Sequence, residues 1–186
     1  MILTLTCGAF SGMMIISQAS GVAINMIGMV PASAAIAVSV LALFNALGRI
    51  VAGFISDRIG RINTLAGALV LSMIGLIALY MCHKGTVALF YAGIAVVGIC
   101  FGSFMGVFPG FTVDRFGPKN NSVNYGIMFI GFALAGYFGP SVMRSIFATD
   151  GAYQRAFLIA LLFDVVGILL TFVYRVVLKK TEGGNH

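Results

Sequence analysis

The sequence predicts an all-α membrane protein with six transmembrane helices. Three observations predict the fold class: the composition, the length of the charge-free stretches, and the lack of alternation within them. Of the 186 residues, 60% are hydrophobic and only 9% are charged, whereas soluble domains contain about 45–50% apolar and about 25% charged residues. A water-soluble monomer is therefore excluded, as is a disordered chain, which requires low hydrophobicity and high charge.

The charge-free stretches give the number of helices. Residues 1–48 carry no charge, and because about 20 apolar residues cross a bilayer as a helix, this stretch is long enough for two crossings. Pro31 marks the break, since proline is tolerated at the first position of a helix. The apolar runs do not alternate with polar residues, as the strands of a membrane barrel would. The sequence predicts one domain over residues 1–186, with helices near 2–28, 32–55, 63–82, 86–110, 122–146 and 156–178.

The first predicted helix carries a polar residue at every seventh position. Because two turns nearly superpose such positions, they form one stripe along the whole span, made of Thr4, Ser11, Gln18 and Asn25. The stripe either lines a water-filled cavity or forms hydrogen bonds with a neighbouring helix. Its full length slightly favours the cavity.

The fourth and sixth predicted helices also carry distinctive residues. Glycine recurs at every fourth position of the fourth helix, at Gly98, Gly102, Gly106 and Gly110. Small residues at this spacing indicate close helix packing, and Pro109 is expected to kink or end the span. Asp164 in the sixth helix is either a carboxylate that couples transport to protons or a structural one paired with a nearby polar group.

The distribution of cations predicts the orientation. With both termini in the cytoplasm, the inner connections and the tail carry seven cations, namely Arg58, Arg61, Arg115, Lys119, Arg175, Lys179 and Lys180. The outer connections carry three, namely Lys84, Arg144 and Arg155. The positive-inside rule therefore predicts a multi-pass protein of the plasma membrane with cytoplasmic termini. No positively charged segment precedes the first helix, which predicts that there is no signal peptide and that the chain is part of a longer protein.

One charged motif connects the second and third predicted helices. In Gly53-Phe54-Ile55-Ser56-Asp57-Arg58-Ile59-Gly60-Arg61, Gly53 permits close approach of a neighbouring helix and Gly60 permits a positive φ in the turn. Asp57 can face an arginine or a helix N-terminus.

This nonapeptide resembles the G-x-x-x-D-R-x-G-R loop motif of the major facilitator superfamily. The resemblance implies twelve helices in two six-helix halves, and a gating role for Gly53, Asp57, Arg58, Gly60 and Arg61. The motif follows the second helix of a half, as it does here. The polar tail from Lys179 to His186 favours the C-terminal half.

Three further stretches are similar to the oxalate:formate antiporter family, whose members carry small carboxylates. They are residues 45–49, residues 107–117 and the run Asn124-Tyr125-Gly126-Ile127-Met128-Phe129. The resemblance implies that Arg49 binds a substrate carboxylate. In the oxalate carrier of this family, a lysine of the eleventh helix is a second cation that holds the substrate. Counting from Tyr125 places Phe132 at the matching position of this chain. One cation suits one carboxylate, so a monocarboxylate such as formate, lactate or pyruvate is expected rather than oxalate.

The residues themselves also indicate a transport site at Arg49. An arginine inside a span is costly and by default marks a substrate or ion path, and its fork of donors suits a carboxylate. The alternative is an arginine that extends along lipid to the membrane surface. Arg49 shares a small, polar face with Ala42, Asn45 and Gly53, which favours the bundle interior. The predicted substrate-binding residues are Arg49, Asn45, Gln18, Tyr125 and Phe132.

The predicted function is secondary active transport of a small organic anion, by alternating access between two six-helix halves. No cluster of nucleophile, base or metal ligands occurs in any span, so no enzyme activity, metal or cofactor is expected, and the scattered cations indicate no nucleic acid. The expected partners are the anion, the lipid bilayer and a second half. The alternatives are a non-transporting assembly partner or remnant half, and a transporter of an unrelated substrate.

Overall fold

The computed structural model describes the backbone of residues 1–183 and the side chains of residues 1–177, so the predictions that concern Lys179, Lys180 and the tail beyond them lie outside the described side chains. The described residues form six long helices and no strand. In chain order these are α1 (Ile2–Val22), which continues as a π-helical turn (Ala23–Ile27), α2 (Pro31–Ile59), α3 (Arg61–Tyr80), α4 (Val87–Phe116), α5 (Asn121–Asp150) and α6 (Gln154–Gly183). All six are long and apolar enough to cross a membrane, which confirms the all-α six-helix prediction.

Several helices are longer than the sequence predicts. α2 continues to Ile59 and α5 to Asp150, a few residues past the predicted ends near 55 and 146. Pro109 does not end α4, which continues to Phe116. The predicted ends mark where apolar residues stop, whereas a helix can continue into the polar layer beyond the hydrocarbon. A proline inside a membrane helix is tolerated because neighbouring helices and local adjustments satisfy the freed backbone groups.

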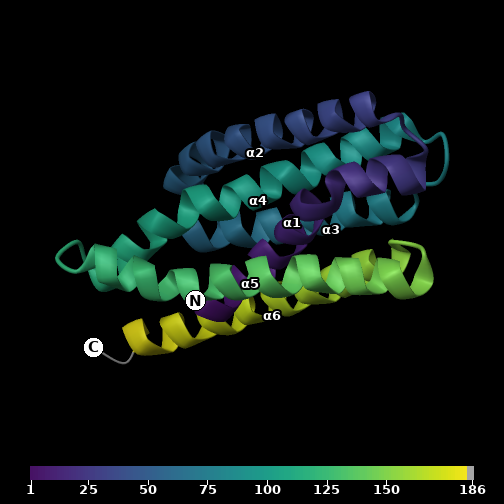
Figure 1. The fold of residues 1–186 in the computed structure, drawn as a ribbon. Helices are drawn as coiled ribbons and strands as arrows, with labels where there is room; N and C mark the ends of the chain where they lie inside the picture. Colours follow the sequence, from purple (N-terminus) through teal and green to yellow (C-terminus); the bar gives the residue numbers. More distant parts are fainter. Residues whose placement is uncertain (184–186) are drawn as a thin grey trace.

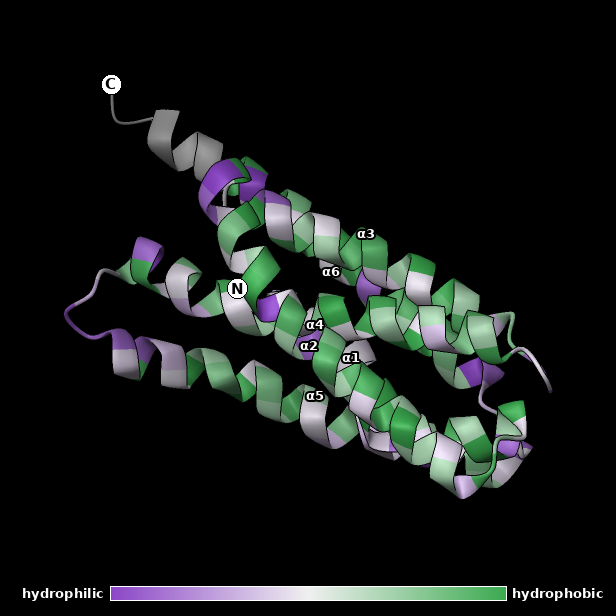
Figure 2. Ribbon diagram, turned by 90° about the horizontal axis from the view of Figure 1, so that it is seen from above, coloured by the Kyte–Doolittle hydropathy of each residue, from purple (hydrophilic) through white to green (hydrophobic). Residues whose placement is uncertain are grey.

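The helices form an elongated bundle with α1 at its centre (Figure 1). α1 packs mainly against α5 and α6, α2 mainly against α4, and α3 against α4 and α6. The α2–α3 and α4–α5 connections lie at one end of the bundle, together with the start of α1 and the end of α6, and the other three connections lie at the opposite end. We call the first the motif end. Figure 2 shows hydrophobic residues along the helices and hydrophilic residues concentrated near both ends, as expected for a membrane-spanning bundle.

The glycine stripe of α4 is the contact surface for α2. A Cβ at Gly102 would overlap the backbone oxygen of Asn45, and one at Gly106 would lie 2.6 Å from the backbone oxygen of Arg49. From the other side, a Cβ at Gly48 would overlap the backbone oxygen of Ile99. The prediction that the stripe serves packing is confirmed.

The polar stripe of α1 bonds to neighbouring helices. Ser11 Oγ donates to Asp164 Oδ1 of α6 (3.1 Å) and lies 3.3 Å from Ser72 Oγ of α3. Asn25 Nδ2 donates to the Tyr153 hydroxyl at 3.5 Å. These bonds favour the helix-packing interpretation of the stripe over the cavity, and they confirm that Asp164 is paired with a polar group.

We expect Gly102→Ala to destabilise the bundle, because its methyl group meets a backbone oxygen of α2 that cannot move without shifting the helix. Overpacking of this kind costs about 1–3 kcal/mol. The matched control is Gly67→Ala in α3, where nothing lies within 4 Å of the new Cβ. That change is expected to be neutral or stabilising by up to about 1 kcal/mol. Thermal unfolding of both variants in detergent checks the expectation, and equal midpoints would contradict the close α2–α4 contact.

Candidate functional site

The charged motif forms the connection between α2 and α3 at the motif end. α2 ends at Ile59, and α3 begins at Arg61 after a single residue, Gly60, with φ +88°. Only glycine adopts this conformation without strain. α4 ends in the same way at Gly117, with φ +77°. Both glycines end an Asp-Arg-x-Gly run, so the two connections at this end share one local design.

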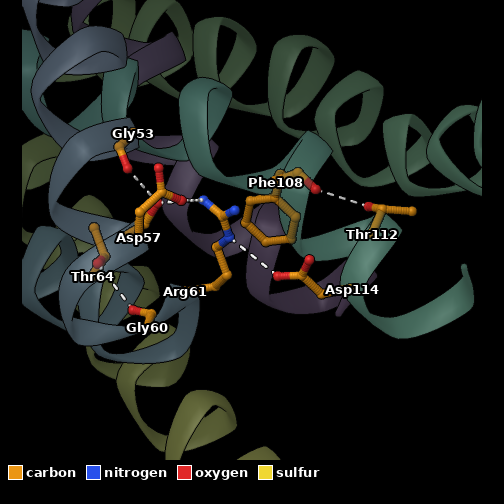
Figure 3. Close-up of polar contacts among 9 residues, drawn as sticks. Gly53, Asp57, Gly60, Arg61, Thr64, Phe108, Thr112 and Asp114 are labelled. Atoms are coloured by element: carbon orange, nitrogen blue, oxygen red, sulfur yellow. Dashed lines mark hydrogen bonds and ion pairs between the residues drawn. The ribbon is translucent and has the colours of Figure 1, made fainter. Parts of the chain in front are cut away.

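The side chain of Arg61, at the start of α3, forms a polar network with residues of α2 and α4 (Figure 3). Its Nη1 lies 2.9 Å from Asp57 Oδ1 of α2, and its Nε donates to Asp114 Oδ2 of α4 at 3.2 Å. Nη1 also donates to Ser56 Oγ at 2.5 Å, and Ser56 Oγ donates to the Gly53 backbone oxygen at 2.8 Å. One guanidinium therefore ties the ends of α2 and α4 to the start of α3.

The last glycine of the α4 stripe makes room for this arginine. A Cβ at Gly110 would lie 3.0 Å from Arg61 Cζ. The stripe therefore has two functions, because Gly98, Gly102 and Gly106 admit the α2 backbone and Gly110 admits the Arg61 guanidinium.

Four of the five residues predicted for gating lie together in the Arg61 network, the fifth lies apart from it, and two further residues join it. The structure brings together Gly53, Asp57, Gly60 and Arg61 and adds Ser56 and Asp114, whereas Arg58 is exposed. The sequence contains a signal for Asp114, since Asp114-Arg115-Phe116-Gly117 repeats the pattern of residues 57–60. The sequence contains no such signal for Ser56, because a single serine within a helix is common and does not indicate a contact with an arginine.

Arg49 lies beside the buried stripe of α2. With about 100° of turn per residue, it falls between the face packed on α4 and the apolar face that carries Leu43, Ile50 and Phe54. Its side chain is exposed in the six-helix chain. Tyr125, another predicted polar residue of the site, lies on α5, and α2 and α5 do not pack against each other.

Asn45 lies one turn away from Arg49 on α2 and is half-buried. Its Oδ1 is buried and has no hydrogen-bond partner among the described residues, and it would lie 3.0 Å from a Cβ on Gly102. A buried acceptor without a donor is unfavourable, so a donor such as a water molecule or a ligand hydroxyl would be stabilised here.

A row of aromatic rings runs along α5 from Tyr125 to Phe132, and Phe132 lies about as far from the motif end as Arg49 does. The ring centroids of Tyr125 and Phe129 are 4.8 Å apart, those of Phe129 and Phe132 are 5.2 Å apart, and Phe132 stacks on Phe101 of α4 at 6.2 Å. From the motif end, Phe132 and Arg49 are each roughly 15 Å along their helices at 1.5 Å per residue. The structure thus places Tyr125 and Phe132 on one aromatic wall.

Gln18 belongs to a different cluster. Its Oε1 and the Tyr153 hydroxyl lie 3.2 and 2.9 Å from the position of a Cβ on Gly21, at the end of α1 opposite the motif. Its role as a substrate ligand stays a prediction.

The site combines one guanidinium, one amide and a row of aromatic rings. A guanidinium holds a carboxylate with paired, charge-assisted hydrogen bonds, and the rings offer an apolar surface to the rest of a small anion. Among the described residues, no group of three His, Cys, Asp or Glu side chains could hold a metal ion.

Comparison with known proteins places these features in a family. The sequence model of the Major Facilitator Superfamily matches residues 1–186. The chain is 36% identical over 124 residues to the uncharacterized MFS-type transporter YhjX of Escherichia coli (strain K12), covering 67% of this chain and 31% of that protein. It is 35% identical over 144 residues to the oxalate:formate antiporter of Oxalobacter formigenes, covering 74% and 33%. The chain thus spans about a third of the length of these relatives.

The fold is similar to that of a solved transporter. The POT family transporter PepTSo superposes with a TM-score of 0.80 at 16% sequence identity, over 94% of this chain and 36% of that one. This likeness supports the six-helix fold and says nothing of the substrate.

We expect Asp114→Asn to loosen the motif end, because it removes one ion pair of the Arg61 network. Exposed pairs contribute up to about 1 kcal/mol, so local opening should increase by up to about fivefold. Hydrogen–deuterium exchange of peptides from residues 53–64 and 108–117 measures it. The control is Asp150→Asn, which removes the Asp150–Arg155 pair (3.3 Å) at the opposite end and should leave these peptides unchanged. Identical exchange in both variants would show that the network does not hold the helices together.

Proposed function

The chain belongs to the Major Facilitator Superfamily, a family of transporters, and from this premise we propose that it forms one half of a secondary active transporter for a small organic anion. The observation that carries the proposal is the position of Arg49. Arg49 lies roughly 15 Å from the motif end of α2 at 1.5 Å per residue, beside the face packed on α4, and it takes no part in the Arg61 network. An intramembrane cation with this placement suits an anionic substrate.

The number of cations favours a monocarboxylate. α5 carries Phe132 at the depth of Arg49, and its cation, Arg144, lies near the opposite end of the bundle. A single guanidinium can neutralise one carboxylate, whereas a second carboxylate of oxalate would be left facing aromatic rings. The oxalate:formate antiporter among the relatives supports the class of small carboxylates, and Phe132 favours its members with one charge, such as formate, lactate and pyruvate.

A second six-helix half would complete the cavity. Substrate sites in such folds lie near mid-membrane between two structural repeats, and the halves rock around the site. The large exposed side chains of α2, including Leu43, Ile50 and Phe54, supply apolar surface for that half or for lipid. In this arrangement the Arg61 network would open and close with the motif end, in the plasma membrane and with this end toward the cytoplasm.

We expect Arg49→Gln to weaken substrate binding strongly. Loss of a charge-assisted hydrogen bond worth about 1.5–3 kcal/mol corresponds to roughly 10- to 150-fold weaker binding. Arg49→Lys keeps the charge but loses the fixed pair of donors, so it should raise the apparent KM less than Arg49→Gln does. The measurement is uptake of labelled formate, lactate, pyruvate and oxalate by proteoliposomes that contain this chain together with a second six-helix half.

Arg144→Gln is the matched control, because it removes an exposed arginine from α5 near the opposite end of the bundle. It should leave the apparent KM unchanged. Unchanged affinity in Arg49→Gln would assign Arg49 to the membrane surface, and preferred uptake of oxalate would overturn the monocarboxylate assignment.

A further inference from the structure

An acidic side chain lies in the middle of the bundle, closed off from its surroundings. Asp164 of α6 is fully buried, at 0% exposed. Counted from the start of α6 at Gln154, it is roughly 15 Å along the helix at 1.5 Å per residue, which is about half of a hydrocarbon core of about 30 Å. Ionisable side chains at this depth are rare and by default mark functional sites. The transport proposal gives Asp164 no role.

Two serines connect Asp164 to the helices packed against α6. Ser11 Oγ of α1 donates to Asp164 Oδ1 at 3.1 Å, and it lies 3.3 Å from Ser72 Oγ of α3. A serine hydroxyl has a single proton, and that of Ser11 goes to Asp164, so Ser72 is the donor to Ser11. The hydrogen bonds therefore run in one direction, from α3 through α1 to Oδ1 on α6.

The other carboxylate oxygen of Asp164 receives no hydrogen bond. Oδ2 is buried and has no partner among the described residues. No described cation pairs with it either. α1 carries no charged side chain, and the charged residues of the other helices that contact α6 lie near helix ends, namely Arg61 of α3 and Arg144 and Asp150 of α5.

The remaining neighbours do not compensate a negative charge. Within α6, the cations Arg155 and Arg175 are roughly 13 and 16 Å from Asp164 along the helix. The titratable side chains buried inside α1 and α4 are the free thiols of Cys7 and Cys100, and a thiol carries no positive charge in either form. An ionised Asp164 would therefore be a buried charge with hydrogen bonds to one oxygen only.

The neutral form of Asp164 suits these surroundings better. A buried carboxylate without a cation is neutralised by taking up a proton. A buried oxygen without a partner costs about 1–3 kcal/mol in a neutral group and more in a charged one. Because Ser11 donates to Oδ1, Oδ1 is the carbonyl oxygen of the neutral acid, and Oδ2 carries the proton.

We propose that Asp164, Ser11 and Ser72 form a proton-binding site, in which the folded chain holds one proton on Asp164 Oδ2 at neutral pH. The proton removes the charge from the point where α1, α3 and α6 meet, and it thereby stabilises their packing. The site is separate from the proposed substrate site, since Arg49 belongs to α2.

A proton fits this site better than a metal cation does. Hard metal cations such as Ca²⁺ take about six to eight oxygen ligands, whereas the described contacts supply the carboxylate and two hydroxyls. One turn along α6, a Cβ at Gly167 would lie 3.0 Å from Leu69 Cδ2 and 3.1 Å from Cys7 Cβ. The three helices are thus in close apolar contact beside Asp164.

Infrared spectroscopy of the 186-residue chain in detergent tests the protonation directly, because a protonated carboxylic acid has a carbonyl stretch that a carboxylate lacks. We expect this band at neutral pH. Asp164→Asn should remove it, whereas the matched control Asp150→Asn, which removes the carboxylate paired with Arg155, should keep it. Absence of the band at neutral pH, or a band that survives Asp164→Asn, would overturn the proposal.

A second pair of variants leaves Asp164 in place, and it decides the question if Asp164→Asn does not fold. Ser11→Ala should shift the band to higher frequency, because it removes the hydrogen bond to the carbonyl oxygen Oδ1. Ser39→Ala is the control, since Ser39 is exposed and donates within its own helix, and it should leave the band in place. An unshifted band in Ser11→Ala would overturn the assignment to this site.

The bound proton also makes the stability of the chain depend on pH. An ordinary aspartate loses its proton near about pH 4, so above this pH the folded chain binds one more proton than the unfolded chain. Rising pH should then lower the ratio of folded to unfolded chain by up to about tenfold per pH unit, until the folded chain loses the proton too. Asp164→Asn should abolish this part of the dependence, and unfolding in SDS between about pH 5 and pH 8 measures it.

Two results of this measurement would overturn the proposal. One is the same pH dependence in the unaltered chain and in Asp164→Asn. The other is stabilisation of the unaltered chain, but not of Asp164→Asn, by sodium chloride and not by choline chloride, since a sodium ion would then occupy the site.

Discussion

The close contact between α2 and α4 sets the positions of the residues on which the proposed function depends. Gly102 and Gly106 allow the backbone of α2 to approach α4 at Asn45 and Arg49, and Gly48 does the same from the other side. In lipid, helices gain little from the hydrophobic effect when they associate, so close van der Waals packing of small residues matters more than it does in water. With its backbone fixed, α2 presents Arg49 at the edge of the contact.

The same stripe of glycines links the deep part of the bundle to the motif end. Gly110 provides the space in which Arg61 contacts Asp57 and Asp114. A shift of α4 relative to α2 would therefore disturb both the surroundings of Arg49 and the Arg61 network. This geometry connects the surroundings of Arg49 and the Arg61 network through a single helix contact.

Most of the fold could be predicted from the sequence, because charge-free stretches of about 20 residues report membrane crossings directly. The packing role of the glycine stripe could also be predicted, since spacing along a helix determines which residues share a face. The ends of α2 and α5 could not, because a helix that leaves the hydrocarbon loses its apolar signal while keeping its hydrogen bonds. Nor could the separation of Gln18 from Arg49, or the inclusion of Ser56 in the Arg61 network, since these depend on how helices pack around one another.

The proposed function requires that the α2–α4 contact hold Arg49 at a water-filled wall and not against lipid. The most direct measurement is thiol accessibility in the assembled transporter, on a background in which Cys7, Cys82 and Cys100 are replaced. Cysteine is placed at either of two neighbouring positions, as Arg49→Cys or as Ile50→Cys, where Ile50 is 60% exposed on the apolar face. We expect a charged, membrane-impermeant thiol reagent to modify the cysteine at position 49 and to leave the one at position 50 unmodified. Modification at position 50 alone, or at neither position, would contradict the proposed function.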